Sequence, residues 1–269
     1  MRKKLLSAPY LVWMTVFIVV PLIMVAYFAF TDENGGFTLS YIADVAQYTN
    51  IFIRSIWLAA IATVICLIIA YPISFILAKT AKNKRGTLLM IVMLPMWMNF
   101  LLRTYAWMTL LGNNGLINQF FGLFGLGPFK MLNTQGAVVL GMVYNYLPYM
   151  ILPLYSVMVK IDMSLLEAAA DLGCNSFKTA AKVIVPLSVP GIMSGITMVF
   201  VPAISTFIIS RMLGGGGNLL IGDLIEMQFL GTSYNPNLGA GISLVLMVII
   251  LLIMTIMNQF DVDDDKVLM

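Results

Sequence analysis

Six long apolar stretches decide what this sequence can fold into. They cover residues 9–30, 55–78, 87–111, 136–159, 187–210 and 238–258. A bilayer core about 30 Å thick is crossed by about 20 mostly apolar residues in a helix, so each stretch is long enough for one span. Charged residues make up only 10% of the 269 residues, whereas about 25% is usual in a soluble domain. The sequence therefore predicts an all-α polytopic membrane protein with six transmembrane helices, and it argues against a soluble enzyme, a disordered chain or a coiled coil.

The basic residues predict the topology. The first apolar run continues to Phe30, which is too long for a signal-peptide core, and no small-x-small cleavage site follows it, so we interpret it as an uncleaved span. Lys and Arg are enriched in cytoplasmic segments. Eleven of the fifteen fall at 2–4, 79–85, 160–182 and 266, against Arg54, Lys130 and Arg211 on the opposite side. We expect a multi-pass membrane protein with both termini in the cytoplasm.

Several kinds of chemistry are missing from the sequence. It has no histidine, and its two cysteines, Cys66 and Cys174, lie far apart and form no CxxC pair. No Gly-Lys pair occurs, so there is no phosphate-binding loop of the GxxxxGK[ST] type. The net charge of +3 is too small to indicate nucleic-acid binding. We expect no catalytic, metal or cofactor site on this chain, and any ATP that drives it is bound by another subunit.

The cytoplasmic connection at about 160–186 has a pattern of its own. Ser164 and the glutamate three residues later have the spacing of a capping box, which predicts that a helix begins at Ser164. Gly173 is placed to end that helix. A second helical stretch, 176–184, is expected to stop at Pro186. The domain organisation is then one membrane domain, 1–269, with this loop and a flexible acidic tail at 259–269.

The first predicted helix of this loop is amphipathic. At helical spacing, Glu167 and Asp171 share one polar face. The opposite apolar face consists of Leu165, Leu166, Ala169 and Leu172. On these residues alone, the segment is an interfacial amphipathic helix.

The spacing of the loop also resembles a known motif. It reads EAA at 167–169, three residues, Gly173, nine residues, and VIVP at 183–186. This is similar to the EAA loop of ABC importer permeases with the MetI-like fold, in which the last element is Ile-x-Leu-Pro. The resemblance implies that the segment docks as a coupling helix in a groove of an ATP-binding subunit. The residues that it assigns to this coupling are Glu167, Ala168, Ala169, Asp171, Gly173 and Pro186.

The same resemblance implies an assembly. Two ATP-binding subunits would hold the ATP-Mg and move the coupling helix, so that the spans alternate between inward-facing and outward-facing states. A second permease subunit, commonly a paralogue in the family, and an extracytoplasmic substrate-binding protein complete the expected partners. A stiff, Ala-rich helix suits a segment that transmits movement. The ATP-binding subunit must contact this helix differently in the inward-facing and outward-facing states.

A second signature concerns the substrate. The third span contains LPMWMNFLLRTYAW at 94–107, followed by GNNGLIN at 112–118. These segments resemble spermidine/putrescine permeases, as do LGGGGNLLIGDLI at 213–225, in which Asp223 replaces the usual Asn, and NLGA at 237–240. The resemblance covers nearly the whole chain and implies a polyamine substrate.

Polar and aromatic residues inside the spans are candidates for the substrate path. A polycation that leaves water is met by carboxylates, carbonyls or aromatic faces. Tyr and Trp usually lie at span ends, whereas Tyr144, Asn145 and Tyr149 lie near the middle of the fourth span. They indicate either a wetted path or hydrogen bonds between helices. Trp97 and Asn99 in the third span are further candidates.

Two acids on the expected outward side are also candidates. Asp223 and Glu226 are three residues apart on a short predicted helix and so share a face. They serve either to attract a cation at the outer mouth, or as solvated acids or contacts for the binding protein. Arg103 is a charge within a span. Because it would repel a cation, we expect it to be structural, pairing with carbonyls or reaching outward.

Two alternatives to a polyamine permease remain. The EAA loop is equally compatible with an ABC permease for sulfate, ferric iron or an amino acid. A secondary transporter or channel would require acids or half-helices at mid-bilayer. No Asp or Glu falls inside the six predicted spans, which argues against that class.

Overall fold

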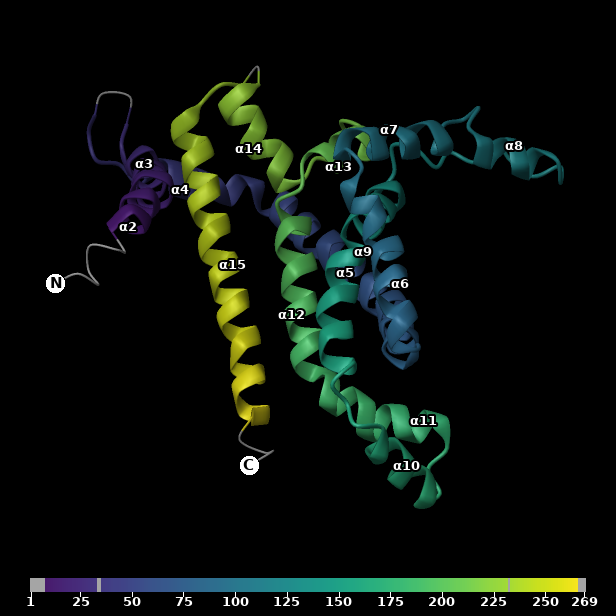
Figure 1. The fold of residues 1–269 in the computed structure, drawn as a ribbon. Coiled ribbons are helices and arrows are strands. Elements are labelled where there is room, and N and C mark those ends of the chain that lie inside the picture. The colour runs from purple at the N-terminus through teal and green to yellow at the C-terminus, as the bar shows by residue number, and fades with distance from the viewer. Residues whose placement is uncertain (1–7, 33–34, 232, 266–269) are drawn as a thin grey trace.

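The computed structural model describes residues 8–32, 35–231 and 233–265, and the structured segments of these ranges are helical (Figure 1). Apart from one isolated bridge between Thr31 and Phe37, the described residues contain no β-pairing. The prediction of an all-α protein is therefore confirmed. The helices in chain order are α2 (Ala8–Met14), η1 (Thr15–Val19), α3 (Val20–Phe30), α4 (Ser40–Asp44), η2 (Val45–Tyr48), α5 (Thr49–Lys79), α6 (Lys82–Trp97), α7 (Phe100–Leu111), α8 (Leu116–Gly122), α9 (Gln135–Met158), α10 (Met163–Asp171), α11 (Ser176–Thr179), η3 (Ala180–Ile184), α12 (Val185–Ile204), α13 (Ile208–Gly214), α14 (Ile221–Leu230) and α15 (Pro236–Asp265).

Five single helical stretches among the described residues are long and apolar enough to cross a membrane. They are Pro9–Phe30, Ser40–Lys79, Gln135–Met158, Ala180–Ile204 and Pro236–Met257. The fourth of these begins earlier and ends earlier than the predicted span 187–210. The last helix, α15, continues to Asp265, so 259–265 of the expected acidic tail is helical. The rest of that tail, 266–269, lies outside the described residues, as do the basic residues at 2–4.

The third predicted span, 87–111, is not a straight helix. The helix α6 ends at Trp97, and the pair formed by Lys82–Trp97 and Phe100–Gly122 is bent by 84°. Met98 and Asn99 are extended, and the Asn99 side chain accepts hydrogen bonds from the N–H groups of Leu101 and Leu102 at 2.9 and 3.3 Å. Asn99 thereby caps a new helix. Hydropathy alone does not detect such a break, because the residues on both sides are apolar.

The helix α9 forms the centre of the bundle. It packs against α5 and α12, which also contact each other, whereas α15 packs mainly against α3 (Figure 1). Gly191 and Gly195 of α12 face α9, where an added Cβ at Gly195 would lie 2.6 Å from Met150 Sδ. Small residues four apart allow two membrane helices to approach closely. The α9–α12 contact therefore depends on these glycines.

The bundle has two distinct ends. The helices α10 and α11 protrude together at one end, which we call the α10 end, while α7, α8, α13 and α14 lie at the other, the α14 end (Figure 1). The helix α12 runs between them. The helix α12 therefore connects the two ends of the bundle directly.

Candidate functional site

The helix α10 begins one residue before the expected start. Asp162 is its N-cap, and the Asp162 carboxylate accepts a hydrogen bond from the Ser164 N–H at 3.0 Å. The predicted capping box of Ser164 and Glu167 is therefore wrong. Asp is as good an N-cap as Ser, and here the N-cap is Asp162, two residues before the predicted cap Ser164.

The end of α10 is where the sequence places it. Gly173 has a φ of +76°, a left-handed conformation that favours glycine. The Cys174 N–H donates to the Ala169 carbonyl at 3.0 Å, and the Gly173 N–H donates to the Ala170 carbonyl at 2.9 Å. This is the Schellman pattern of helix termination. It turns the chain sharply into α11, as predicted for a helix–turn–helix.

The second helical stretch does not stop at Pro186. The helices α11, η3 and α12 follow one another without a break, so Ser176–Ile204 is continuous. Pro186 lies in the first turn of α12, directly after the π-helical turn η3 at Ala180–Ile184. Proline cannot donate to the carbonyl four residues earlier, and a wider π turn removes the need for that bond. Where the sequence predicts that the helix stops, the structure has a continuous helix that joins the loop to the fifth span.

The two faces of α10 differ in what they contact. Glu167 and Asp171 are both exposed, as the predicted polar face requires. The predicted apolar face is divided, because Ala169 is buried whereas Leu165 and Leu172 are 46% and 85% exposed. Leu166 lines a cavity of about 170 Å³ between α10 and the membrane helices, together with Phe75, Ala78, Met158, Ile161 and Ile184. Leu166 and Ala169 thus fix α10 to the bundle, while the two acids on its polar face and the two leucines at the edge of its apolar face are exposed.

The candidate path residues of α9 do not lie together. Asn145 is buried, and its Nδ2 donates to the Gly141 carbonyl at 2.8 Å, while Tyr149 is exposed. The Asn145 Oδ1 has no hydrogen-bond partner among the described residues. Tyr146, between them, reaches the Pro202 carbonyl of α12 at 3.3 Å. Of these two hydrogen bonds, the one from Asn145 stays within α9 and only the one from Tyr146 connects two helices.

Tyr144 lies in a separate groove. Its ring meets the Trp107 ring edge-on, with 5.4 Å between the centroids. The groove has a volume of about 710 Å³ and runs between α5, α7 and α9. Its wall includes Trp57, Trp107, Gln135, Leu140, Val143 and Tyr144. Three aromatic rings in an otherwise apolar wall provide faces that attract cations.

The three candidates of the broken third span have different surroundings. Trp97 is 71% exposed at the end of α6, and Asn99 serves as the helix cap described above. Arg103 is buried, and its Nε and Nη1 have no hydrogen-bond partner among the described residues. Its guanidinium carbon lies 5.8 Å from the centroid of the Phe100 ring. No carbonyl accepts from these two nitrogens among the described residues, so the expected pairing with carbonyls is not observed for them, while the burial of the side chain agrees with the expected structural role.

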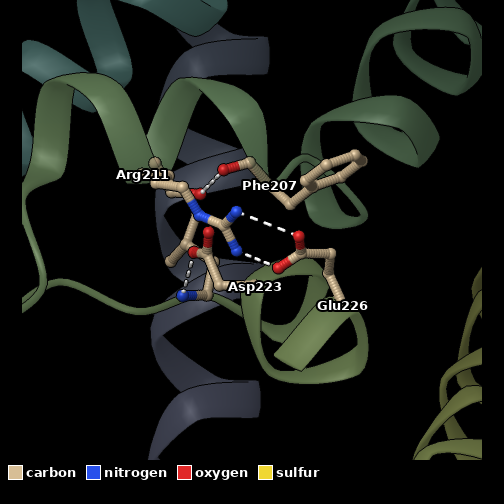
Figure 2. A network of polar contacts seen from close by, with 6 residues as sticks. Phe207, Arg211, Asp223 and Glu226 are labelled. Carbon is tan, nitrogen blue, oxygen red and sulfur yellow. Dashed lines mark hydrogen bonds and ion pairs between the residues drawn. The ribbon is translucent and has the colours of Figure 1, made fainter. Parts of the chain in front are cut away.

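Charged side chains gather at the α14 end (Figure 2). Arg211 of α13 donates to both carboxylate oxygens of Glu226 on α14, with Nη1 to Oε1 at 2.9 Å and Nη2 to Oε2 as the second bond. Asp223 lies one turn earlier on α14 and is fully buried. Its Oδ2 accepts from the Leu220 N–H at 2.9 Å, which caps the helix. Asp223 and Glu226 thus share a face as predicted, but Arg211 already neutralises one of them.

The two acids have opposite pKa shifts. Burial raises the pKa of the Asp223 carboxyl, although Ser210, the Leu220 N–H and Arg211 act in the opposite direction. The hydrogen bonds from Arg211 lower the pKa of Glu226, and the same contact raises the pKa of Arg211. Desolvation disfavours a charged carboxylate, whereas a nearby cation favours it. The two acids therefore differ because one is buried and the other is paired.

This difference predicts opposite pH dependence for two conservative substitutions. A carboxyl with a raised pKa costs stability once the pH rises above its unfolded value of about 4. Asp223→Asn removes that cost and keeps an oxygen for the Leu220 N–H. We expect the variant to unfold about 2–4 °C higher than the wild type at pH 7.5, with the difference disappearing near pH 4.

Glu226→Gln is the matched control. The pKa of Glu226 is lowered, so its stabilising effect is present above its unfolded pKa of about 4.3 and is lost as the pH falls through the folded value. The Gln variant should therefore unfold at a lower temperature than the wild type at pH 7.5. Thermal unfolding of the purified chain in detergent at both pH values measures both effects. A lower unfolding temperature for Asp223→Asn at pH 7.5 would contradict the assignment.

Two of these contacts, the ion pair of Arg211 with Glu226 and the position of Trp57 in the groove, cannot be predicted from the sequence pattern. Arg211 and Glu226 are fifteen residues apart on different helices, so no periodicity connects them. Trp57 is one of several aromatic residues in α5, and only the packing of α5 against α9 places it opposite Tyr144. Both contacts depend on tertiary structure, which local spacing does not encode.

A bundle of apolar helices, several of them long enough to cross a bilayer, is the architecture of an integral membrane protein, and here a helical protrusion extends from one end. The family described as binding-protein-dependent transport system inner membrane component matches residues 70–261. The chain belongs to that family.

Similar proteins agree with this assignment. The spermidine/putrescine transport system permease protein PotB of Haemophilus influenzae is 38% identical over 261 residues, which cover 93% of this chain and 91% of that protein. PotB of Escherichia coli is 35% identical, covering 88% of this chain and 90% of that protein. A bacterial alginate ABC transporter solved in complex with an alginate pentasaccharide-bound periplasmic protein contains a chain of the same fold. Its TM-score is 0.80 at 15% identity, covering 96% of this chain and 94% of that one.

Proposed function

We propose that this chain is the membrane-spanning permease subunit of an ATP-driven ABC importer that carries spermidine or putrescine into the cytoplasm. The observation that carries the proposal is the identity of 35–38%, over nearly the whole chain, with proteins named as spermidine/putrescine permeases. The aromatic groove of Trp57, Trp107 and Tyr144 supports it, since aromatic faces attract ammonium groups.

We further propose how the chain is driven. The exposed surface of α10, which includes the acids Glu167 and Asp171 on one face and Leu165 and Leu172 on the other, docks in a groove of one of two partner ATPase subunits, which hold the ATP-Mg. The chain has no phosphate-binding loop of its own, and this supports the assignment of hydrolysis to the partners. The continuous helix Ser176–Ile204 then carries the movement of the loop into the bundle.

The family, which is described as binding-protein-dependent, supports our proposal for the remaining partners. A second permease subunit, a paralogue of this chain, completes the translocation path, and an extracytoplasmic binding protein delivers the substrate. With α10 facing the ATPase, the α10 end is cytoplasmic and the α14 end is extracytoplasmic. The basic residues at 79–85 and 160–182 flank the α10 end, in agreement with the enrichment of Lys and Arg on the cytoplasmic side. Both termini are then cytoplasmic.

Competition in cells tests the substrate. The chain and its partners are expressed in a strain without its own polyamine importers, and the uptake of labelled spermidine is measured. We expect uptake that excess putrescine suppresses and that sulfate, ferric iron and amino acids leave unchanged. Uptake of one of those other solutes, with none of spermidine or putrescine, would replace the polyamine assignment by another substrate.

A further inference from the structure

The ion pair of Arg211 and Glu226 places a cation in a negatively charged site. Arg211 donates to both oxygens of Glu226, and the two side chains are 50% and 21% exposed. Arg211 approaches from α13 and Glu226 from α14, so the pair joins two helices at the α14 end (Figure 2). The site is therefore accessible to solvent on the Arg211 side.

A second carboxylate beside this pair is incompletely satisfied. Asp223 is fully buried, and its Oδ1 accepts no hydrogen bond of ordinary geometry among the described residues, because the nearby Ser210 hydroxyl donates to the Phe207 carbonyl at 2.9 Å. Figure 2 shows the Asp223 carboxylate beside the guanidinium of Arg211. A buried oxygen without a partner is costly, and it is rare in folded proteins. The site thus has more acceptor oxygens than the single guanidinium satisfies.

We propose that Arg211 occupies a binding site for a substrate ammonium group, and that an incoming polyamine displaces it from Glu226. This inference rests on the proposed function, since it assumes a polyammonium substrate that arrives at the α14 end. Arg211 is then an internal competitor, which holds α13 against α14 until substrate is present.

The energetics allow such an exchange. An ion pair with one partner half exposed is weak in water, because solvent screens it and because holding a long side chain in place costs entropy. An ammonium group has three donors. Once Arg211 has moved aside, this group can contact Glu226 and the free Asp223 oxygen together, whereas the Arg211 guanidinium makes both of its hydrogen bonds to Glu226. The displaced guanidinium can move into solvent, where its charge is well hydrated.

Equilibrium binding of radiolabelled spermidine tests the proposal. The assembled transporter, with its ATPase and second permease, is placed in nanodiscs without the binding protein, so that this complex alone provides the binding sites. We expect Arg211→Gln to bind spermidine about two- to fivefold more tightly than the wild type, because the competitor is gone. Arg211→Lys keeps the positive charge but loses the bidentate contact with Glu226. Its affinity for spermidine should therefore lie between those of the wild type and Arg211→Gln. Glu226→Gln should bind more weakly than the wild type.

Arg54→Gln is the matched control. Arg54 also lies at the α14 end, but it donates to the Gly217 carbonyl and not to an acid. Its replacement removes the same positive charge and should leave the affinity unchanged. Equal tightening in Arg54→Gln and Arg211→Gln would show a general electrostatic effect and overturn the proposal, as would unchanged affinity in Arg211→Gln or an absence of binding in every protein. Failure of the proposed function as a polyamine importer would give a different result, because the wild-type complex with its binding protein would then not transport spermidine.

Discussion

Glu167→Lys is expected to lower ATP-driven substrate uptake by at least about tenfold while leaving the amount of the chain in the membrane unchanged. Glu167 is exposed on α10, and no hydrogen bond or ion pair within the described residues involves its side chain, so the bundle does not need it for folding. Its effect must then come from a partner. Loss of a charged contact that becomes buried in an interface costs about 2–5 kcal/mol, and every 1.4 kcal/mol is a factor of ten.

The control for this prediction is Asp44→Lys, which makes the same change in net charge on α4, away from α10 (Figure 1). Within the described part of the chain, the Asp44 carboxylate accepts one hydrogen bond, from the Gln47 Nε2 at 3.2 Å. Uptake by vesicles containing the assembled transporter, normalised to the amount of chain on an immunoblot, gives the comparison. Wild-type uptake by Glu167→Lys would mean that α10 does not couple the chain to its ATPase.

Gly222→Leu is expected to prevent the chain from folding to its native bundle. An added Cβ at this buried position would lie 2.5 Å from each of the Ser205 and Thr206 carbonyl oxygens, which are backbone atoms and cannot move aside alone. The helix α14 would have to leave the junction of α12 and α13. We expect a loss of more than about 4 kcal/mol, the range of severe core defects, and a several-fold fall in the amount of folded protein.

Gly86→Leu distinguishes this effect from a general intolerance of leucine in place of glycine. Gly86 is also helical, in α6, but nothing lies within 4 Å of an added Cβ. Size-exclusion chromatography in mild detergent measures the monodisperse fraction of each variant. Similar monodisperse fractions for Gly222→Leu and the wild type would contradict the close approach of α14 to the α12–α13 junction.

The sequence predicts the parts of the fold that depend on local patterns. Apolar length locates the spans, and Gly173 marks the end of α10, because a left-handed residue there satisfies the helix carbonyls. The cap of α10 was misplaced, since Asp162 and Ser164 are both good caps and spacing alone does not choose between them. Pro186 was misread as a stop, because a π turn before it is a property of the folded helix.

The candidate site was harder to predict than the fold. The break at Asn99 lies between two apolar segments, so hydropathy joins them into one span. Asp223 and Glu226 were placed on one face correctly, but the cation between them comes from another helix. For Arg103 the sequence predicts carbonyl partners, yet its Nε and Nη1 have none among the described residues and its guanidinium lies near the Phe100 ring. In each case the missing information is the tertiary arrangement of the helices.

The most direct test of the account is the uptake of labelled spermidine by proteoliposomes that contain this chain with its ATPase, second permease and binding protein. We predict accumulation that requires ATP on the side of the ATPase, requires the binding protein, and falls at least about tenfold in Glu167→Lys. The chain purified alone should hydrolyse no ATP. Accumulation of spermidine without the ATPase would contradict the account, because the chain would then move its substrate without the partner that α10 is proposed to contact.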